Sequence, residues 1–210
     1  FFPDVGATFA LPRLPDAAGV YLALTGDRVG QGDALALGLA THTAASARMG
    51  ELAEALTGTA PVDEILAAFA QPVAPGKLFA ERQAMAAAFG APTLAGILAR
   101  LEAGAAAGEA FATKALATIR AKSPTSVAIV FEQMRRGASL DFAGAMALEF
   151  RIVSRIAHGR DFYEGVRAVV IDKDQAPVWQ PASIEALDPA AVEAHFAPLG
   201  ATELVLGRPA

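Results

Sequence analysis

Apolar residues recur every three or four positions along most of this chain, and Gly, Pro and small polar residues interrupt them at short intervals. This spacing is typical of amphipathic helices with regular breaks. It predicts helices over residues 5–14, 17–25, 33–38, 46–57, 62–70, 77–89, 93–103, 106–121, 124–136, 141–157, 162–168 and 189–196. The sequence therefore predicts a mostly α-helical chain.

Two segments depart from the helical pattern. Val169-Val170-Ile171 is the run most like a β-strand, although it fits equally well as the continuation of the helix before it. Leu39–His42 is a candidate for a short extended piece. So few strands in 210 residues predict that the chain is the helical part of a larger structure.

Composition narrows the classes of function. A net charge of −5 argues against a nucleic-acid binder, which usually carries a basic patch. The chain has no Cys and only three widely separated His, so we expect no metal site. No apolar run approaches the roughly 18 residues of a membrane span. The mean hydropathy of +0.39 is nevertheless high, which predicts apolar faces that meet another segment or another subunit.

Asp4 is the residue best suited to chemistry. A carboxylate beside a Gly at the entrance of a helix can act as a general acid or base, or accept a hydrogen bond from a substrate hydroxyl. It can equally cap the N-terminus of helix 5–14, where the helix dipole favours a negative charge. The two roles are compatible, so position alone leaves both open.

A charged cluster lies at the start of helix 162–168. Asp161 and Glu164 have the spacing of a capping box, with Asp in place of Ser or Thr. A structural interpretation has these acids bonded to backbone N–H groups and Arg167 paired with a carboxylate. The functional alternative has Arg167 or Lys173 bound to a phosphorylated ligand. Capping explains the acidic spacing by itself, which favours the structural interpretation.

Glu149 lies close to the apolar stripe of helix 141–157, which we place at Phe142, Met146, Phe150, Val153 and Ile156. An unpaired buried carboxylate is costly, so we expect a structural ion pair, with an Arg from another helix as the candidate partner. These residues by themselves predict a helix-rich globular segment with one notable carboxylate, and they predict no reaction.

A series of motifs along the whole chain resembles the crotonase (enoyl-CoA hydratase/isomerase) superfamily and, more narrowly, the 3-hydroxyisobutyryl-CoA hydrolases. The motifs are FPDVG at 2–6, LPRL at 11–14, LALTG at 22–26, GLATH at 38–42, SPTS at 123–126, EFR at 149–151, DFYEGVRA at 161–168, IDKD at 171–174 and PVW at 177–179. In this superfamily hydratases typically carry Gly where Asp4 stands, whereas hydrolases and dienoyl-CoA isomerases carry Asp. The DFYEGVRA and IDKD segments favour the hydrolases.

The resemblance implies the C-terminal helical part of a crotonase-type α/β spiral fold, with residues 1–45 as the end of the core and 46–210 as a helical C-terminal region. It implies hydrolysis of a short 3-hydroxyacyl-CoA thioester, such as 3-hydroxyisobutyryl-CoA in valine breakdown. Asp4 would be catalytic, and Asp4, Gly6 and, more weakly, Lys173 would bind substrate. No cofactor is expected, because CoA is part of the substrate. We further expect a homo-oligomer formed through the helical region, and the composition suggests a bacterial cytoplasm.

In this family the backbone N–H groups of the oxyanion hole and a second carboxylate, from a Glu, lie N-terminal to the FPDVG motif. Neither is among these 210 residues, so we expect the chain alone to be inactive. Two alternatives remain open. One is enoyl-CoA hydratase or dienoyl-CoA isomerase chemistry, and the other is a non-catalytic helical interaction fragment.

Overall fold

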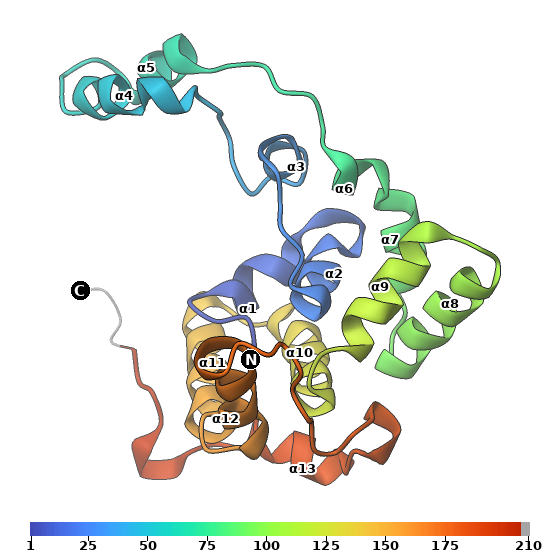
Figure 1. The fold of residues 1–210 in the computed structure, drawn as a ribbon. Helices are drawn as coiled ribbons and strands as arrows, with labels where there is room; N and C mark the ends of the chain where they lie inside the picture. The colour runs from blue at the N-terminus through green and yellow to red at the C-terminus, as the bar shows by residue number, and fades with distance from the viewer. Residues whose placement is uncertain (207–210) are drawn as a thin grey trace. The chain divides into compact units, whose positions relative to one another are not determined.

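A computed structural model describes residues 1–206, which form helices and turns and contain no β-strand (Figure 1). This confirms the mostly helical chain. The residues divide into two compact units, one built from residues 1–26 and from Ala84 onward, the other from Asp27–Gln83. The resemblance divides the chain differently, into the end of the crotonase core at residues 1–45 and a helical region at 46–210. That division concerns the match to the crotonase core, and it stays a prediction.

The first unit carries the motif with Asp4. Its α-helices are α1 (Ala7–Ala10), α2 (Ala18–Thr25), α8 (Leu94–Ala106), α9 (Ala110–Arg120), α10 (Pro124–Gly137), α11 (Phe142–Ile156), α12 (Arg160–Val166) and α13 (Pro189–Ala194). Short 3₁₀ turns lie at Leu11–Arg13, Pro15–Ala17, Ile184–Ala186 and Gly200–Thr202. Helix α7 (Arg82–Phe89) begins just before the sequence boundary between the units.

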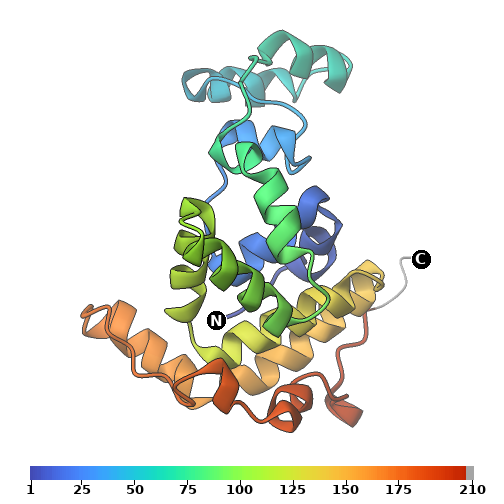
Figure 2. The ribbon, with the colours of Figure 1, turned by 90° about the vertical axis from the view of Figure 1, so that its right-hand side faces the viewer.

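Helices α8 and α9 lie side by side in both views, and α2 packs on α10 (Figures 1 and 2). Tyr21 of α2 contacts the ring of Phe89 edge-on, with the centroids 5.2 Å apart, and stacks on Phe111 of α9. The largest fully buried side chains of this unit are mostly aliphatic and come from α7 to α11. They include Met85, Phe89, Ile97, Leu101, Ile119, Ile129, Met134 and Ile152.

The second unit consists of α3 (Gln31–Ala36), α4 (Met49–Ala55), α5 (Val62–Phe69) and α6 (Lys77–Ala80), with a 3₁₀ turn at Ser46–Arg48. Asp33 ties α3 to α6, because its buried carboxylate accepts hydrogen bonds from the backbone N–H groups of Leu78 and Phe79. The guanidinium of Arg48 lies 4.0 Å from the centre of the Phe69 ring.

Three expectations about local structure need correction. Residues Arg167–Ile171 form a π-helical turn that continues α12, so the strand interpretation of Val169-Val170-Ile171 is wrong and the helical alternative is right. Residues 39–42 are irregular, with bends at Leu39 and Thr41, so the expectation of a short extended piece is wrong. The buried face of α11 consists of Ala145, Leu148, Glu149, Ile152 and Ile156, whereas Phe142 and Phe150 are exposed.

Candidate functional site

Asp4 lies on an exposed turn that leads into α1. The backbone N–H of Ala7 donates to the carbonyl of Asp4 at 3.1 Å, and Val5 and Gly6 both adopt positive φ, at 53° and 91°. The N-cap position of α1 is Gly6, which has no side chain with which to cap the helix. Within residues 1–206 the Asp4 carboxylate has no hydrogen bond or ion pair. The N-cap interpretation of Asp4 is therefore wrong, and its carboxylate remains available to a partner.

Glu149 caps this helix instead. Glu149 is 4% exposed, and its two side-chain oxygens accept separate hydrogen bonds. The N–H of Gly6 donates to Oε2 at 3.0 Å, and the N–H of Thr8 donates to Oε1 at 2.9 Å. Hydrogen bonds to a charged acceptor are strong, and the N-terminus of a helix favours a negative charge. The partner of Glu149 is thus a pair of backbone amides, and the expectation of an Arg is wrong.

Gln133 of α10 contacts the same turn from another side. It is fully buried, and its Nε2 donates to the carbonyl of Pro3 and to Oγ1 of Thr8, both at 2.6 Å. Sequence reasoning missed this residue. The available signal was a Gln between Val130 and Met134 on the buried face of an amphipathic helix, where a polar side chain needs a partner.

Helix α10 also approaches α1 through Gly137. A Cβ at Gly137 would lie 2.2 Å from the carbonyl oxygen of Thr8, so only Gly permits this contact. The turn from Pro3 to Thr8 is therefore held against two helices, α10 and α11, that come from the far half of the sequence.

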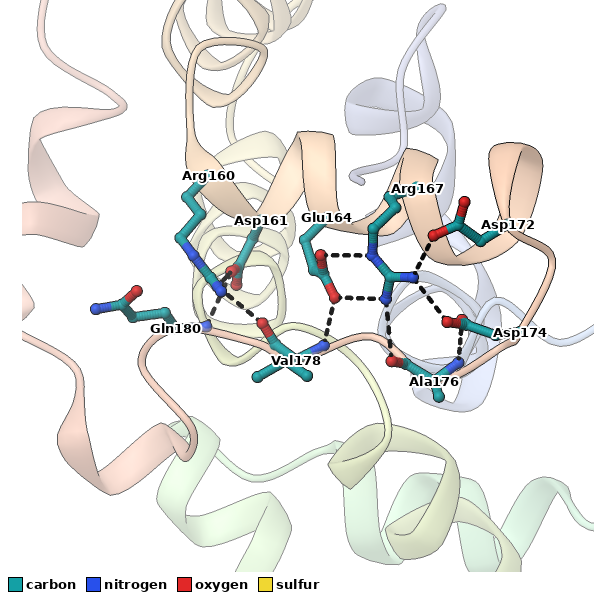
Figure 3. A network of polar contacts seen from close by, with 9 residues as sticks. All are labelled: Arg160, Asp161, Glu164, Arg167, Asp172, Asp174, Ala176, Val178 and Gln180. Atoms are coloured by element: carbon teal, nitrogen blue, oxygen red, sulfur yellow. Dashed lines mark hydrogen bonds and ion pairs between the residues drawn. The ribbon is translucent and has the colours of Figure 1, made fainter.

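The DFYEGVRA segment ties α12 to the loop that follows it (Figure 3). Asp161 accepts from the hydroxyl of Ser123 at 2.6 Å and from the N–H of Gln180 at 2.9 Å. Glu164 accepts from the N–H of Val178 at 2.7 Å. Helix α12 begins at Arg160 after Gly159, with no side-chain cap, so the capping box of Asp161 and Glu164 is wrong.

Arg167 lies at the centre of this network (Figure 3). It makes two hydrogen bonds to Glu164 at 3.0 and 2.9 Å, and one each to Asp172, Asp174 and the carbonyl of Ala176. All five of its N–H donors are used. The pKa of Glu164 is lowered to about 2, mostly by the hydrogen bonds from Arg167 and further by the one from the Val178 N–H. The pKa of Arg167 is raised, mostly by its hydrogen bonds to Glu164 and further by those to Asp174 and Asp172.

Arg167 consequently has no donor left for a phosphorylated ligand. Lys173 is exposed at a positive φ of 57°, and within the described part of the chain no hydrogen bond or ion pair joins it to Asp4 or Gly6. The structure thus brings Gly6 and Glu149 to the Asp4 turn, and it places Asp161, Glu164, Arg167 and Lys173 in or beside the α12 network.

A cavity of about 890 Å³ adjoins the motif. Phe1, Phe2 and Pro3 form part of its wall, together with Phe162 and Trp179, while Asp4 and Gly6 are not among its lining residues. Trp179 is fixed there by a hydrogen bond from Nε1 to the carbonyl of Ala121 at 3.0 Å. The cavity wall is mostly apolar.

No cluster of three or more His, Asp or Glu suited to a metal ion occurs among residues 1–206. In the same residues, none of the helices combines the length and the apolar character needed to cross a membrane.

Comparison with known proteins identifies the family. A family model described as enoyl-CoA hydratase/isomerase matches residues 1–196. The chain belongs to the enoyl-CoA hydratase/isomerase family. The crotonase resemblance carried by the FPDVG and DFYEGVRA motifs is thereby confirmed.

Several relatives of this enoyl-CoA hydratase/isomerase family member bear the name mitochondrial 3-hydroxyisobutyryl-CoA hydrolase. The protein from Xenopus laevis is 36% identical over 98% of this chain and 55% of its own length, and that from Gallus gallus is 37% identical over the same shares. The human protein is 35% identical over 97% of this chain and 54% of its own length. The chain thus spans about half the length of these relatives.

Two solved structures have the same fold. A carnitinyl-CoA dehydratase from Mycobacterium thermoresistibile superposes with a TM-score of 0.85 at 32% identity, over 98% of this chain and 58% of that protein. An enoyl-CoA hydratase from Rhodobacter sphaeroides superposes with a TM-score of 0.85 at 37% identity, over 98% and 59%.

Proposed function

We propose that this chain forms part of a CoA-thioester hydrolase that acts on a short 3-hydroxyacyl-CoA such as 3-hydroxyisobutyryl-CoA. The observation that carries the proposal is the 34–37% identity, over at least 95% of the chain, to relatives from Xenopus laevis, Gallus gallus and Dictyostelium discoideum that are named as hydrolases of that compound. Water adds to the thioester carbonyl carbon, the C–S bond breaks, and the products are the free hydroxy acid and the thiol of CoA.

Asp4 is the proposed catalytic residue of this chain. Its carboxylate is exposed and without a partner in the described residues, on a turn whose backbone is fixed from two sides. Such a carboxylate suits a hydrogen bond from the 3-hydroxyl group of the substrate, or proton transfer beside the thioester. Gly6, on the same turn as Asp4, would let the substrate approach the backbone closely because it has no side chain. Lys173 offers an exposed cation for the phosphates of CoA.

The strongest electrostatic contribution to thioester hydrolysis comes from donors that stabilise the developing oxyanion. The crotonase resemblance implies that these donors and the second carboxylate precede the FPDVG motif, so we expect the isolated chain to release no CoA. We also propose that the enzyme needs no cofactor or metal, forms homo-oligomers through its helical region and works in the cytoplasm of a bacterium. The named relatives, by contrast, are mitochondrial proteins.

A second candidate is hydration or dehydration of an enoyl-CoA. It is favoured by the two solved structures, which are of a dehydratase and a hydratase. The two reactions differ in their products, because hydrolysis releases a thiol, whereas hydration removes the absorbance of the enoyl thioester without releasing one.

The test uses the full-length protein with 3-hydroxyisobutyryl-CoA and thiol detection, and in parallel with a short enoyl-CoA and ultraviolet absorbance. We expect thiol release, and we expect Asp4→Asn to lower kcat/KM by about 10²- to 10⁴-fold, the usual contribution of a positioned acid or base. Asp63→Asn, an exposed carboxylate on α5, serves as the control. Enoyl hydration without thiol release would replace the hydrolase proposal with the second candidate.

A further inference from the structure

Two buried polar side chains hold the backbone on both sides of Asp4. Gln133 binds the carbonyl of Pro3, which belongs to the peptide bond that precedes Asp4. Glu149 binds the N–H of Gly6, two residues after Asp4, and that of Thr8. The bonds come from α10 and α11, each at least 14 residues long and packed in the core of the first unit.

The turn between these anchors is strained. Val5 has a φ of 53°, in the left-handed region that a β-branched residue rarely adopts, and its side chain is 89% exposed. Val5 therefore gains no packing that offsets its conformation. Strain of this kind persists only where the surroundings determine the backbone, and it is concentrated at functional sites.

We propose that Glu149, together with Gln133, is a positioning residue that fixes the Asp4 carboxylate for catalysis. The inference rests on the proposed hydrolase function and adds to it a group that never touches the substrate. Glu149 is suited to this task because each of its oxygens accepts one amide, so the carboxylate plane fixes both the position and the direction of the turn.

The chemistry of the side chain makes the proposal testable. In Glu149→Gln the size is retained, but one of the two acceptors becomes an NH₂ group that faces a backbone N–H donor. In Glu149→Asp both acceptors remain, and the shorter side chain draws them away from the turn. Misplacement of a reacting group by about 1 Å can cost about 10²-fold in rate.

The decisive experiment is a double-mutant cycle in the full-length enzyme, with Asp4→Asn, Glu149→Gln and the double variant assayed for thiol release from 3-hydroxyisobutyryl-CoA. We expect Glu149→Gln to lower kcat by about 10- to 100-fold while KM changes by less than about 3-fold. In the Asp4→Asn background the same change should lower kcat by less than about 2-fold, because no carboxylate is left to position. High enzyme concentrations keep the residual rates measurable.

Glu203→Gln is the matched control. Glu203 also accepts a backbone N–H, that of Leu199 at 3.0 Å, and pairs with Arg151 of α11, but it has no contact with the Asp4 turn. We expect its kcat to stay within about 2-fold of the wild type. Equal losses of kcat from Glu149→Gln with and without Asp4, or no loss in either background, would overturn the positioning role.

Hydrogen exchange of the peptide covering residues 1–10 separates this proposal from the hydrolase function. Glu149→Gln should speed exchange of the Gly6 and Thr8 amides while the rest of the protein keeps its wild-type protection. If the exchange of these two amides is unchanged, the positioning role of Glu149 is overturned, whatever the activity of the variant. If the wild-type enzyme releases no thiol, the hydrolase function is overturned. The exchange result then decides by itself whether Glu149 holds the turn that carries Asp4. If Glu149→Gln fails to fold, Glu149→Asp carries both measurements, with a smaller loss of kcat expected.

Discussion

The substitution Gln133→Glu tests whether the Pro3 carbonyl depends on the amide donor seen in the structure. Gln133 is fully buried, and its Nε2 lies 2.6 Å from that carbonyl oxygen. The substitution replaces the donor with a carboxylate oxygen of nearly the same size. An ionised carboxylate in this fully buried position would face the Pro3 carbonyl oxygen, which is an acceptor, and only the Thr8 hydroxyl beside it could donate. The folded protein should therefore hold the introduced carboxyl in its protonated form, donating to Pro3.

The energetic cost follows from the cost of that protonation. The ordinary pKa of Glu is about 4.3, so keeping the introduced carboxyl neutral costs about 1 kcal/mol at pH 5 and about 3.7 kcal/mol at pH 7, at 1.36 kcal/mol per unit. The pKa of the introduced group is higher in the folded than in the unfolded state. The variant should therefore match the wild type below pH 4 and lose stability steadily as the pH rises toward the folded pKa.

Urea unfolding monitored by helical circular dichroism at pH 4, 5, 6 and 7 measures this difference in free energy. Gln133→Leu provides the control, because it removes the donor without adding a titratable group. Its cost, about 1–3 kcal/mol for the polar groups left unpaired, should not change with pH. A Gln133→Glu variant whose destabilisation is the same at pH 4 and pH 7 would refute the contact with Pro3.

Two further predictions concern the packing and the charge network. Gly137→Ala should destabilise the protein by about 1–3 kcal/mol, because the new Cβ would overlap the Thr8 carbonyl, and thermal unfolding should show a lower Tm than for the wild type. Arg167→Met should move the pKa of Glu164 from about 2 back toward its ordinary value of 4.5. A carboxyl with a lowered pKa contributes stability above its unfolded pKa and loses it as the pH falls through the folded pKa, so the acid transition of Trp179 fluorescence should begin at a higher pH in the variant, with Trp179→Phe as the blank.

Helices were the part of this fold that local sequence could predict. Ser123 accepts from the Ser126 N–H and precedes Pro124 at the first helical position, as the Ser-Pro pattern predicts. Asp188 likewise caps α13 through the Ala190 N–H. Periodicity and capping depend on neighbours within about four residues, so a single sequence contains the needed information.

The contacts of the site depend on residues far apart in the chain, and local rules failed there. Glu149 reaches Gly6 across 143 positions, and Gln133 reaches Pro3 across 130. The sequence could show that a carboxylate on a buried helical face needs a partner. It could not distinguish an Arg partner from two backbone amides. Nearly every residue has a backbone N–H, so the sequence does not show which of these groups lacks a partner. The same limit applies to Asp161, whose carboxylate bonds Ser123 and Gln180 rather than its own helix.

Asp4 and Glu149 illustrate what this long-range contact achieves. A helix that begins beside an Asp would ordinarily use that Asp to satisfy its first N–H groups, and a carboxylate so engaged is less available to a substrate. Here Glu149 satisfies the N–H groups of Gly6 and Thr8 from the protein interior. Because that requirement is met from α11, the Asp4 carboxylate can remain unpaired at the surface. The buried Glu149 thus caps the helix, and the exposed Asp4 carboxylate keeps both oxygens free for the catalytic role that we propose for it.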